Sequence, residues 1–280
     1  MKTLTPERKK QIVSCLVEGN SIRSTCRITG TSKGAVLALI EEMGEACADL
    51  HNEKVRNLTT RRVQCDEIWS FVGMKQKTAK KQGHRGFGIG DVWTWTAIDA
   101  DSKLMVSWLL STRDAGAAFE FMTDVASRLS GRVQLTTDGH SAYLSAVPGV
   151  FGLDVDYAML VKTYGEDPNS EHRYSPPVVL SCESKKIIGF PEPKHISTSY
   201  VERSNLTIRM AMRRFTRLTN GFSKSVINHG HAIALHMVHY NFCRVHQSLR
   251  VTPAMEAGIT DHVWEIDELV ALLPEKHGYR

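Results

Sequence analysis

The sequence predicts an α/β protein in which a small all-helical domain precedes a larger domain built on a mixed sheet. Three observations favour this fold class. Short segments with caps and apolar stripes fill the first 50 residues, and strand-like segments alternate with helical ones from residue 63 onward. The 280 residues are also long enough for one large domain or two unequal ones.

Three short helices are expected in residues 1–50. Thr5 can cap the first helix, Ser21 the second and Ser32 the third, and Gly30 ends the second. Two short helices joined by a tight glycine turn are typical of a helix-turn-helix. We therefore predict a helix-turn-helix DNA-binding domain at 1–50, with a plain three-helix packing module as the alternative.

Base contacts from such a motif would come from the N-terminal end of the third helix, because Glu41 and Glu42 follow later in it. The candidate DNA-binding residues here are Arg27, Ser32 and Lys33. Residues 51–62 are polar and basic, and we interpret them as a linker. The larger domain is expected at 63–258, and a C-terminal helical tail at 259–280.

Five strands and four helices are expected after the linker. The strands are predicted at 63–72, 92–98, 104–110, 132–137 and 156–161, with helices at 114–129, around Tyr143, at 200–217 and at 223–243. The first three strands can form an antiparallel set, and the last two can join in parallel through helices. This order describes a ribonuclease-H-like mixed sheet. Residues 163–198 contain five prolines and no periodicity, so they are predicted to form a long functional or mobile loop.

The chain carries no sign of export or of a membrane anchor. No apolar run approaches the roughly 20 residues of a membrane span, and the N-terminus lacks a signal-peptide core. Six cysteines lie far apart without a C-x-x-C pair, which favours free thiols in a reducing cytoplasm. We expect a cytoplasmic protein with no membrane partner.

Positive charge is segregated along the chain, although the net charge is only +5. Residues 203–255 hold eight lysines and arginines and no acidic residue. Such segregation suits a polyanion, because each neutralised phosphate releases counterions, whereas a solvated cationic face is the simpler alternative. The candidate phosphate-binding residues outside the first domain are Lys75, Lys77, Lys80, Lys81, Arg203, Arg209, Arg213, Arg214 and Arg217.

Three carboxylates are positioned to meet at the predicted sheet. Asp66 lies in the first strand, Asp138 ends the fourth, and Glu202 falls in the first turn of the late helix. Strands one and four are neighbours in this topology, so the two aspartates can lie side by side. Hard divalent cations such as Mg²⁺ prefer oxygen ligands, and two such ions can serve an in-line displacement at a phosphate.

Other candidate ligands are weaker. Glu67 is adjacent to Asp66 but faces the opposite side of the strand, so we expect only one of them to reach the site. Asp99 and Asp101 flank a turn and are interpreted as turn formers. Histidines at 229–239 lack a metal-binding spacing, so a packing or DNA-facing role is expected.

Three stretches of the chain resemble a known family. TTDGH, KHISTSYVERSNLTIRMAMRRFTRLTN and HYNFCRVHQSLRVTPAM are similar to bacterial insertion-sequence transposases of the DDE type, especially the insertion-sequence-one family. The resemblance covers about residues 60–258. It implies a ribonuclease-H-like core, dependence on Mg²⁺ or Mn²⁺ with two ions, and an acidic triad of Asp66, Asp138 and Glu202. Better-known members carry a cysteine-rich zinc motif before the helix-turn-helix, and this sequence has none.

The resemblance also implies a reaction and partners. Such enzymes hydrolyse a strand at the end of a mobile element and use the freed 3′-hydroxyl to attack target DNA. The expected partners are the double-stranded terminal repeats, target DNA and further copies of the chain when ends are paired, in a prokaryotic nucleoid. Two alternatives stay open: a DNA-binding regulator without catalysis, and a structure-selective nuclease with the same core.

Overall fold

A computed structural model of the chain describes residues 4–165, 178–217 and 219–274. Six strands form one mixed sheet in the order β3-β2-β1-β4-β5-β6. Their bounds are β1 Arg62–Val72, β2 Gly90–Asp99, β3 Met105–Ser111, β4 Gln134–Asp138, β5 Asp156–Gly165 and β6 Val178–Ile188. Strands β1, β2 and β3 pair antiparallel, and β4 joins β1 and β5 in parallel. The expected arrangement of the first five strands is confirmed.

The sixth strand was not expected. Strand β6 pairs antiparallel with β5 inside the segment 163–198, which was predicted to be a loop. Residues 166–177 of that segment lie outside the described residues. Residues 179–187 are all exposed, so the strand has no buried face. Its sequence therefore lacks the alternation of apolar and polar residues by which a half-buried strand is recognised.

Three helices open the chain, as expected: α1 Pro6–Val17, α2 Ile22–Thr29 and α3 Lys33–Lys54. The side chains of Thr5, Ser21 and Ser32 cap them, each accepting from a backbone N–H three residues later. Gly30 ends α2 in the left-handed conformation, with φ 65°.

The predicted linker at 51–62 is instead packed into the fold. Helix α3 continues to Lys54, and the His51 ring lies 3.0 Å from the Val106 carbonyl oxygen of β3. Val55 is fully buried, and Leu58 forms an isolated bridge with Leu129. Two apolar residues among many polar ones gave too weak a signal for packing, although they are the residues that fix this segment.

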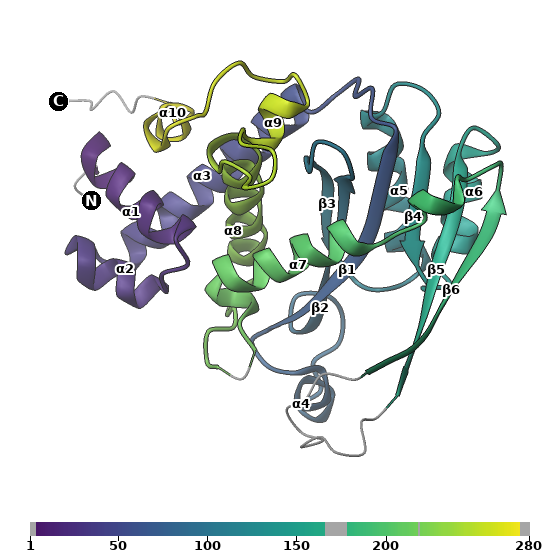
Figure 1. Cartoon of the computed structure of the whole chain (residues 1–280). Helices are drawn as coiled ribbons and strands as arrows, with labels where there is room; N and C mark the ends of the chain where they lie inside the picture. Colours follow the sequence, from purple (N-terminus) through teal and green to yellow (C-terminus); the bar gives the residue numbers. More distant parts are fainter. Residues whose placement is uncertain (1–3, 166–177, 218, 275–280) are drawn as a thin grey trace.

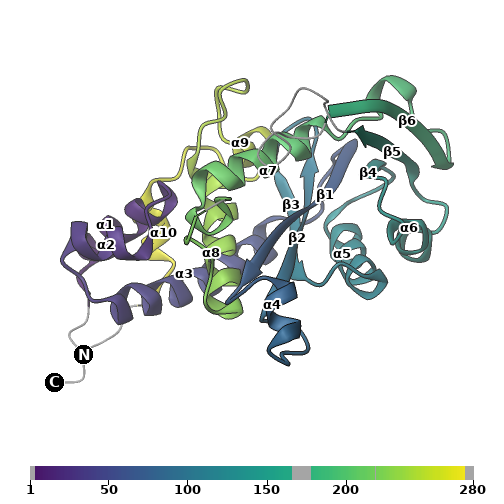
Figure 2. The same cartoon turned by 90° about the horizontal axis from the view of Figure 1, so that it is seen from below.

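Helices cover both faces of the sheet (Figure 1). Helices α7 Ser199–Ala211 and α8 Val226–Val238 lie on one face, and α5 Ala115–Arg128 and α6 Tyr143–Phe151 lie on the other (Figure 2). Apolar side chains fill both layers: Ile68, Ile208 and Met237 pack on the α7 side, and Trp95 and Phe121 pack on the α5 side. Helix α8 also packs against α3, so the first three helices and the sheet share one core.

Shorter elements complete the described chain. Helix α4 Gln76–Lys81 forms between β1 and β2, where no helix was predicted, and a π-helical turn, His239–Cys243, follows α8. Helices α9 Pro253–Glu256 and α10 Ile266–Ala271 lie near the C-terminus, and α10 packs against α1, where Lys10 pairs with Asp267. None of the described helices has the length and apolar character needed to cross a membrane.

Candidate functional site

Asp66 and Asp138 lie side by side on neighbouring strands. Cys65 of β1 is in register with Thr137 of β4, and the two strands are parallel. Each aspartate directly follows one of these paired residues. A pairing across 72 positions of sequence therefore brings together the two carboxylates that the sequence predicted to meet.

The Asp66 carboxylate is held on the α7 face of the sheet. Its Oδ1 accepts from the backbone N–H of Glu67 at 2.8 Å, and its Oδ2 accepts from Asn205 Nδ2 at 2.9 Å. Burial, followed by the negative charge of Asp138, raises the pKa of Asp66 to about 7. The two hydrogen bonds lower the pKa of Asp66 but do not offset its burial and the nearby charge of Asp138.

The Asp138 carboxylate is fixed by the turn that follows β4. Its Oδ1 accepts from the backbone N–H of His140 at 3.0 Å. Its Oδ2 lies 3.6 Å from Arg113 Nη2. Arg113 follows β3 in sequence and stacks over the Trp93 ring at 4.7 Å from its centroid. A guanidinium thus lies at the edge of the acidic cluster.

Glu67 corrects one expectation. It does face away from Asp66, toward α5 and α6, but one ligand oxygen from each of Asp66, Glu67 and Asp138 can lie within 4.8 Å of the others. The Glu67 side chain is 0% exposed, and its Oε2 accepts from Arg113 Nε at 2.9 Å. Burial, followed by Asp138, raises the pKa of Glu67 to about 7. The strand ladder to β4 ends beside Asp138, so both faces of β1 are close to that residue.

Glu202 lies in the first turn of α7, as predicted, but outside this compact cluster. Thr198 Oγ1 donates to Glu202 Oε1 at 2.6 Å, and Lys162 of β5 pairs with the same oxygen. After burial and Asp138, the charge of Glu202 is a further contribution to the raised pKa of Asp66. Glu202 is therefore close enough to Asp66 to interact with it electrostatically.

The donor set fits a divalent metal ion. Asp66, Glu67 and Asp138 offer only carboxylate oxygens, the ligands that Mg²⁺ and Mn²⁺ prefer. Burial is the main cause of the raised pKa values of Asp66 and Glu67, and repulsion by the charge of Asp138 adds to it. A divalent cation between them would offset that repulsion.

The basic residues predicted to bind DNA fall into three places. Arg27, Ser32 and Lys33 are exposed on α2 and at the start of α3, and Lys75, Lys77, Lys80 and Lys81 are exposed on and next to α4. Arg203 is exposed on α7, but α7 ends at Ala211 rather than continuing to 217. Arg213 and Arg214 therefore lie in a 3₁₀ turn, Arg213–Phe215, and not on the helical ridge of Glu202.

Two of these arginines, Arg209 and Arg214, are half-buried. Burial and Arg217 lower the pKa of Arg209 to about 10, and its Nη1 lies 3.5 Å from the Phe215 carbonyl oxygen. Burial lowers the pKa of Arg214 to about 10, and its Nη1 donates to Ser223 Oγ at 3.0 Å. Asp66 partly offsets the lowering for Arg209, so this guanidinium lies within electrostatic reach of the acidic cluster.

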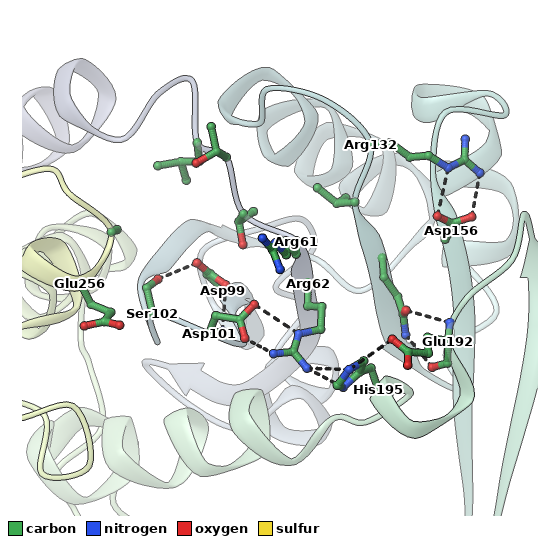
Figure 3. Close-up of a pocket in the computed structure, with 16 residues that line it drawn as sticks. Arg61, Arg62, Asp99, Asp101, Ser102, Arg132, Asp156, Glu192, His195 and Glu256 are labelled. Atoms are coloured by element: carbon green, nitrogen blue, oxygen red, sulfur yellow. Dashed lines mark hydrogen bonds and ion pairs between the residues drawn. The ribbon is translucent and has the colours of Figure 1, made fainter.

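Asp99 and Asp101 are turn formers, as expected. Asp99 accepts from the backbone N–H of Asp101 at 2.9 Å and from Ser102 Oγ at 2.6 Å. They line a cavity of about 640 Å³ at the N-terminal ends of β1, β4 and β5 (Figure 3). Arg62 forms an ion pair there with Asp101, and Arg132 forms one with Asp156. Many of the charged side chains that line this cavity are therefore already paired with one another.

His229 is a packing residue. Its ring nitrogens lie 3.0 Å from Ser70 Oγ and 2.7 Å from Ser223 Oγ, which ties α8 to β1. Burial lowers its pKa to about 3. For His229 this favours packing over the DNA-facing role that was also expected for the histidines of this segment.

No role was assigned to Arg113, Lys162 or Asn205 from the sequence. Asn205 Oδ1 also accepts from Thr96 Oγ1 at 3.2 Å, so its amide links α7, β1 and β2. Its spacing of three from Glu202 was a usable signal. A single arginine after a strand and a single lysine within one offer no comparable pattern.

Comparison with known proteins leaves the family open. No protein-family model and no curated protein matches the chain. Among solved structures, the chain is similar to the Mos1 strand transfer complex and the Mos1 transposase paired-end complex with left transposon end. Each is 15% identical with a TM-score of 0.25, over 56% of this chain and 59% or 60% of the other.

A third solved structure is the piggyBac transposase synaptic complex with hairpin DNA. It is 11% identical with a TM-score of 0.42, over 98% of this chain and 72% of that one. The chain thus spans about three fifths of the matched Mos1 chains. At TM-scores below 0.5, these likenesses establish neither a shared fold nor a shared activity.

Proposed function

We propose that this chain is a DNA transposase of the DDE type with a ribonuclease-H-like catalytic domain. The observation that carries the proposal is the placement of Asp66 and Asp138 on adjacent parallel strands, with Glu202 on the helix that crosses them. The resemblance of residues 60–258 to the insertion-sequence-one family supports the same assignment.

The proposed metal ligands are Asp66, Asp138 and Glu202, with Mg²⁺ or Mn²⁺ as the ion and two ions as the expected number. When bound, two such ions activate the attacking oxygen and stabilise the leaving oxygen of an in-line displacement. Asn205 orients Asp66, and the His140 backbone N–H orients Asp138. Lys162 and Thr198 both contact Oε1 of Glu202, so Oε2 is the oxygen that would reach a metal ion.

The proposed partner is double-stranded DNA. Arg27, Ser32 and Lys33, exposed at the helix-turn-helix, would read the terminal repeats, and the lysines of α4 with Arg203, Arg209, Arg213 and Arg217 would bind phosphates, whereas Arg214 is held inside the fold by Ser223. Pairing of two ends would bring together at least two copies of the chain, inside a prokaryotic cell. Domain bounds of 1–50 and 63–258 stay part of this proposal, and the packed segment 51–62 joins the two rigidly.

Products of one reaction separate the three candidate functions. Purified full-length chain would be incubated with Mg²⁺, a supercoiled target plasmid and labelled duplexes made from the DNA that flanks its gene. A transposase cuts the duplex and joins it to the plasmid. A nuclease of the same core cuts without joining, and a regulator binds without cutting. Cutting without any joined product, at every metal and end sequence tried, would contradict the proposal.

A further inference from the structure

We propose that Arg113 binds a phosphate of the cleaved DNA strand and that Glu67 is the positioning residue that holds it in place. This inference rests on the transposase function proposed above. Neither residue belongs to the acidic triad or to the basic residues that the sequence suggested.

Three contacts hold the guanidinium of Arg113, and part of the side chain is exposed to solvent. Its Nε donates to Glu67 Oε2 at 2.9 Å, its Nη2 lies 3.6 Å from Asp138 Oδ2, and its guanidinium stacks over the Trp93 ring. The side chain is still 34% exposed, and no hydrogen bond within the described part of the chain uses Nη1. A planar guanidinium held in this way is suited to bind a phosphate with two parallel donors.

Glu67 has the properties of an anchor for that arginine. It is completely buried, and a buried carboxylate is costly unless a cation compensates it. Arg113 is the cation that forms its closest ion pair, at 2.9 Å from Nε to Glu67 Oε2, whereas His140 Nδ1 lies 3.7 Å from the same oxygen. Glu67 Oε1 and the Tyr143 hydroxyl lie close together but do not meet hydrogen-bond geometry with any described group.

The geometry gives the two contacts of Arg113 different roles. The contact to Asp138 is longer than a hydrogen bond, whereas the contact to Glu67 is a hydrogen-bonded ion pair. With Asp138 engaged by a divalent cation, Arg113 keeps Glu67 and can turn its free donors to a phosphate oxygen beside that site. The rival role for Glu67 is that of a metal ligand, since its carboxylate belongs to the same cluster.

Four variants separate these roles: Arg113→Gln, Arg113→Lys, Glu67→Gln and, as a matched control, Arg132→Gln. Arg132 is also an ion-paired, partly exposed arginine, but it lines the cavity at the opposite end of the strands. Three quantities would be measured on folded protein: Mn²⁺ affinity by calorimetry, the salt dependence of DNA affinity in Ca²⁺, and the single-turnover cleavage rate.

Loss of Arg113 should remove one phosphate contact. Arg113→Gln should flatten the slope of log K against log salt by about one unit and slow cleavage about 100-fold. Arg113→Lys should restore the slope but only part of the rate, because an ammonium cannot bind two oxygens in the same plane. Glu67→Gln should leave Mn²⁺ and DNA affinity unchanged while slowing cleavage about tenfold or more.

Two results would overturn the inference. Loss of Mn²⁺ binding in Glu67→Gln would make Glu67 a metal ligand rather than an anchor. An unchanged salt slope and rate in Arg113→Gln, matching Arg132→Gln, would make Arg113 a stacked surface residue. If the wild-type chain binds DNA but never cleaves it, the proposed function fails, and the salt slope of Arg113→Gln alone still decides whether Arg113 binds a phosphate.

Discussion

Asn205 of α7 donates from Nδ2 to Asp66 Oδ2 at 2.9 Å while its Oδ1 accepts from Thr96 Oγ1 at 3.2 Å. The two bonds fix which side of the amide faces the carboxylate. They also hold α7, and with it Glu202, against the strand that carries Asp66. Gln64 of β1 adds to this placement, because its Oε1 accepts from the backbone N–H groups of Tyr200 and Val201 in α7.

Replacing Asn205 should therefore disturb the metal site without unfolding the protein. Asn205→Ala removes the donor that orients Asp66, and loss of such an outer partner typically costs about 10- to 100-fold in metal affinity or activity. The measurement is Mn²⁺ affinity by calorimetry together with the cleavage rate. Thr207→Ala, on the same helix with a hydroxyl bonded to the Arg203 carbonyl oxygen, is the control and should behave as wild type. If the two variants had the same Mn²⁺ affinity and cleavage rate, Asn205 would have no role in the metal site.

Arg209→Ala should weaken DNA binding and reduce its dependence on salt. Arg209 lies next to α7's C-terminal end, half-buried and within electrostatic reach of Asp66. One lost phosphate contact should flatten the slope of log K against log salt by about one unit. Lys194→Ala, which removes a residue paired with Glu192, controls for a general change in charge. A slope equal to wild type in both variants would place Arg209 in packing rather than in DNA binding.

Helices α3 and α8 cross closely, and this contact gives a prediction about protein stability and DNA preference. A Cβ on Gly44 would lie 2.3 Å from His231 Cβ and 2.5 Å from its Cα, so the helices must move apart in Gly44→Ala. We expect a loss of about 1–3 kcal/mol in the free energy of unfolding and weaker preference for element ends over random DNA.

Gly34 is the matched control for this test. It lies in the same helix, and a Cβ there would meet no atom within 4 Å. Gly34→Ala should gain about 0.5–1 kcal/mol, because alanine is the better helix former. Chemical denaturation measures both values. A Gly44→Ala protein as stable as Gly34→Ala would show that the crossing is loose.

This crossing also shows where the sequence was informative and where it was not. The caps at Thr5, Ser21 and Ser32 and the five strands follow local rules, because they depend on hydrogen bonds and alternation within a few residues. The close approach of α3 to α8 requires a glycine, Gly44, opposite His231, which lies 187 positions away in the chain. Deletion of the first 56 residues would therefore strip a packed helix from the core and would not test DNA recognition alone.

In the candidate site, too, some contacts could be predicted from the sequence and others could not. Asp66 and Asp138 could be paired from the sequence, because parallel strands bring equivalent positions together. The contacts of Glu67 and Arg113 could not, since they depend on where the ladder between β1 and β4 ends and on the path of the chain after β3. The period of a strand predicts which face of the sheet a side chain lies on, but it does not predict which residues that side chain contacts.

Buried histidines should make the fold sensitive to acid. Burial lowers the pKa of His51, His229 and His236 to about 3 each, so the unfolded chain binds more protons than the folded one between about pH 6.5 and 3. The contribution of each histidine to the free energy of unfolding should fall as pH decreases through that window, by up to about 1.4 kcal/mol per pH unit, against the opposite contribution of Asp66 and Glu67, whose pKa values are raised.

His229→Gln isolates one of these contributions. The variant should show a shallower dependence of unfolding free energy on pH than wild type, whatever its own stability at neutral pH. The exposed His84→Gln is the control and should keep the wild-type slope. A slope unchanged by His229→Gln would mean that His229 keeps its proton equilibrium on unfolding, contrary to its burial.

The most direct test of the account is the single-turnover cleavage rate of Asp138→Asn on a labelled element-end duplex in Mg²⁺, compared with wild type and with Asp99→Asn. The amide keeps the size of Asp138 and its bond from the His140 N–H but removes the charge that would hold a divalent cation. Loss of that stabilisation should slow cleavage at least about 1,000-fold, or about 4 kcal/mol. Asp66→Asn and Glu202→Gln should match it, with DNA binding retained, while Asp99→Asn stays active. Cleavage by Asp138→Asn at a rate near that of wild type would contradict the assignment of the catalytic centre.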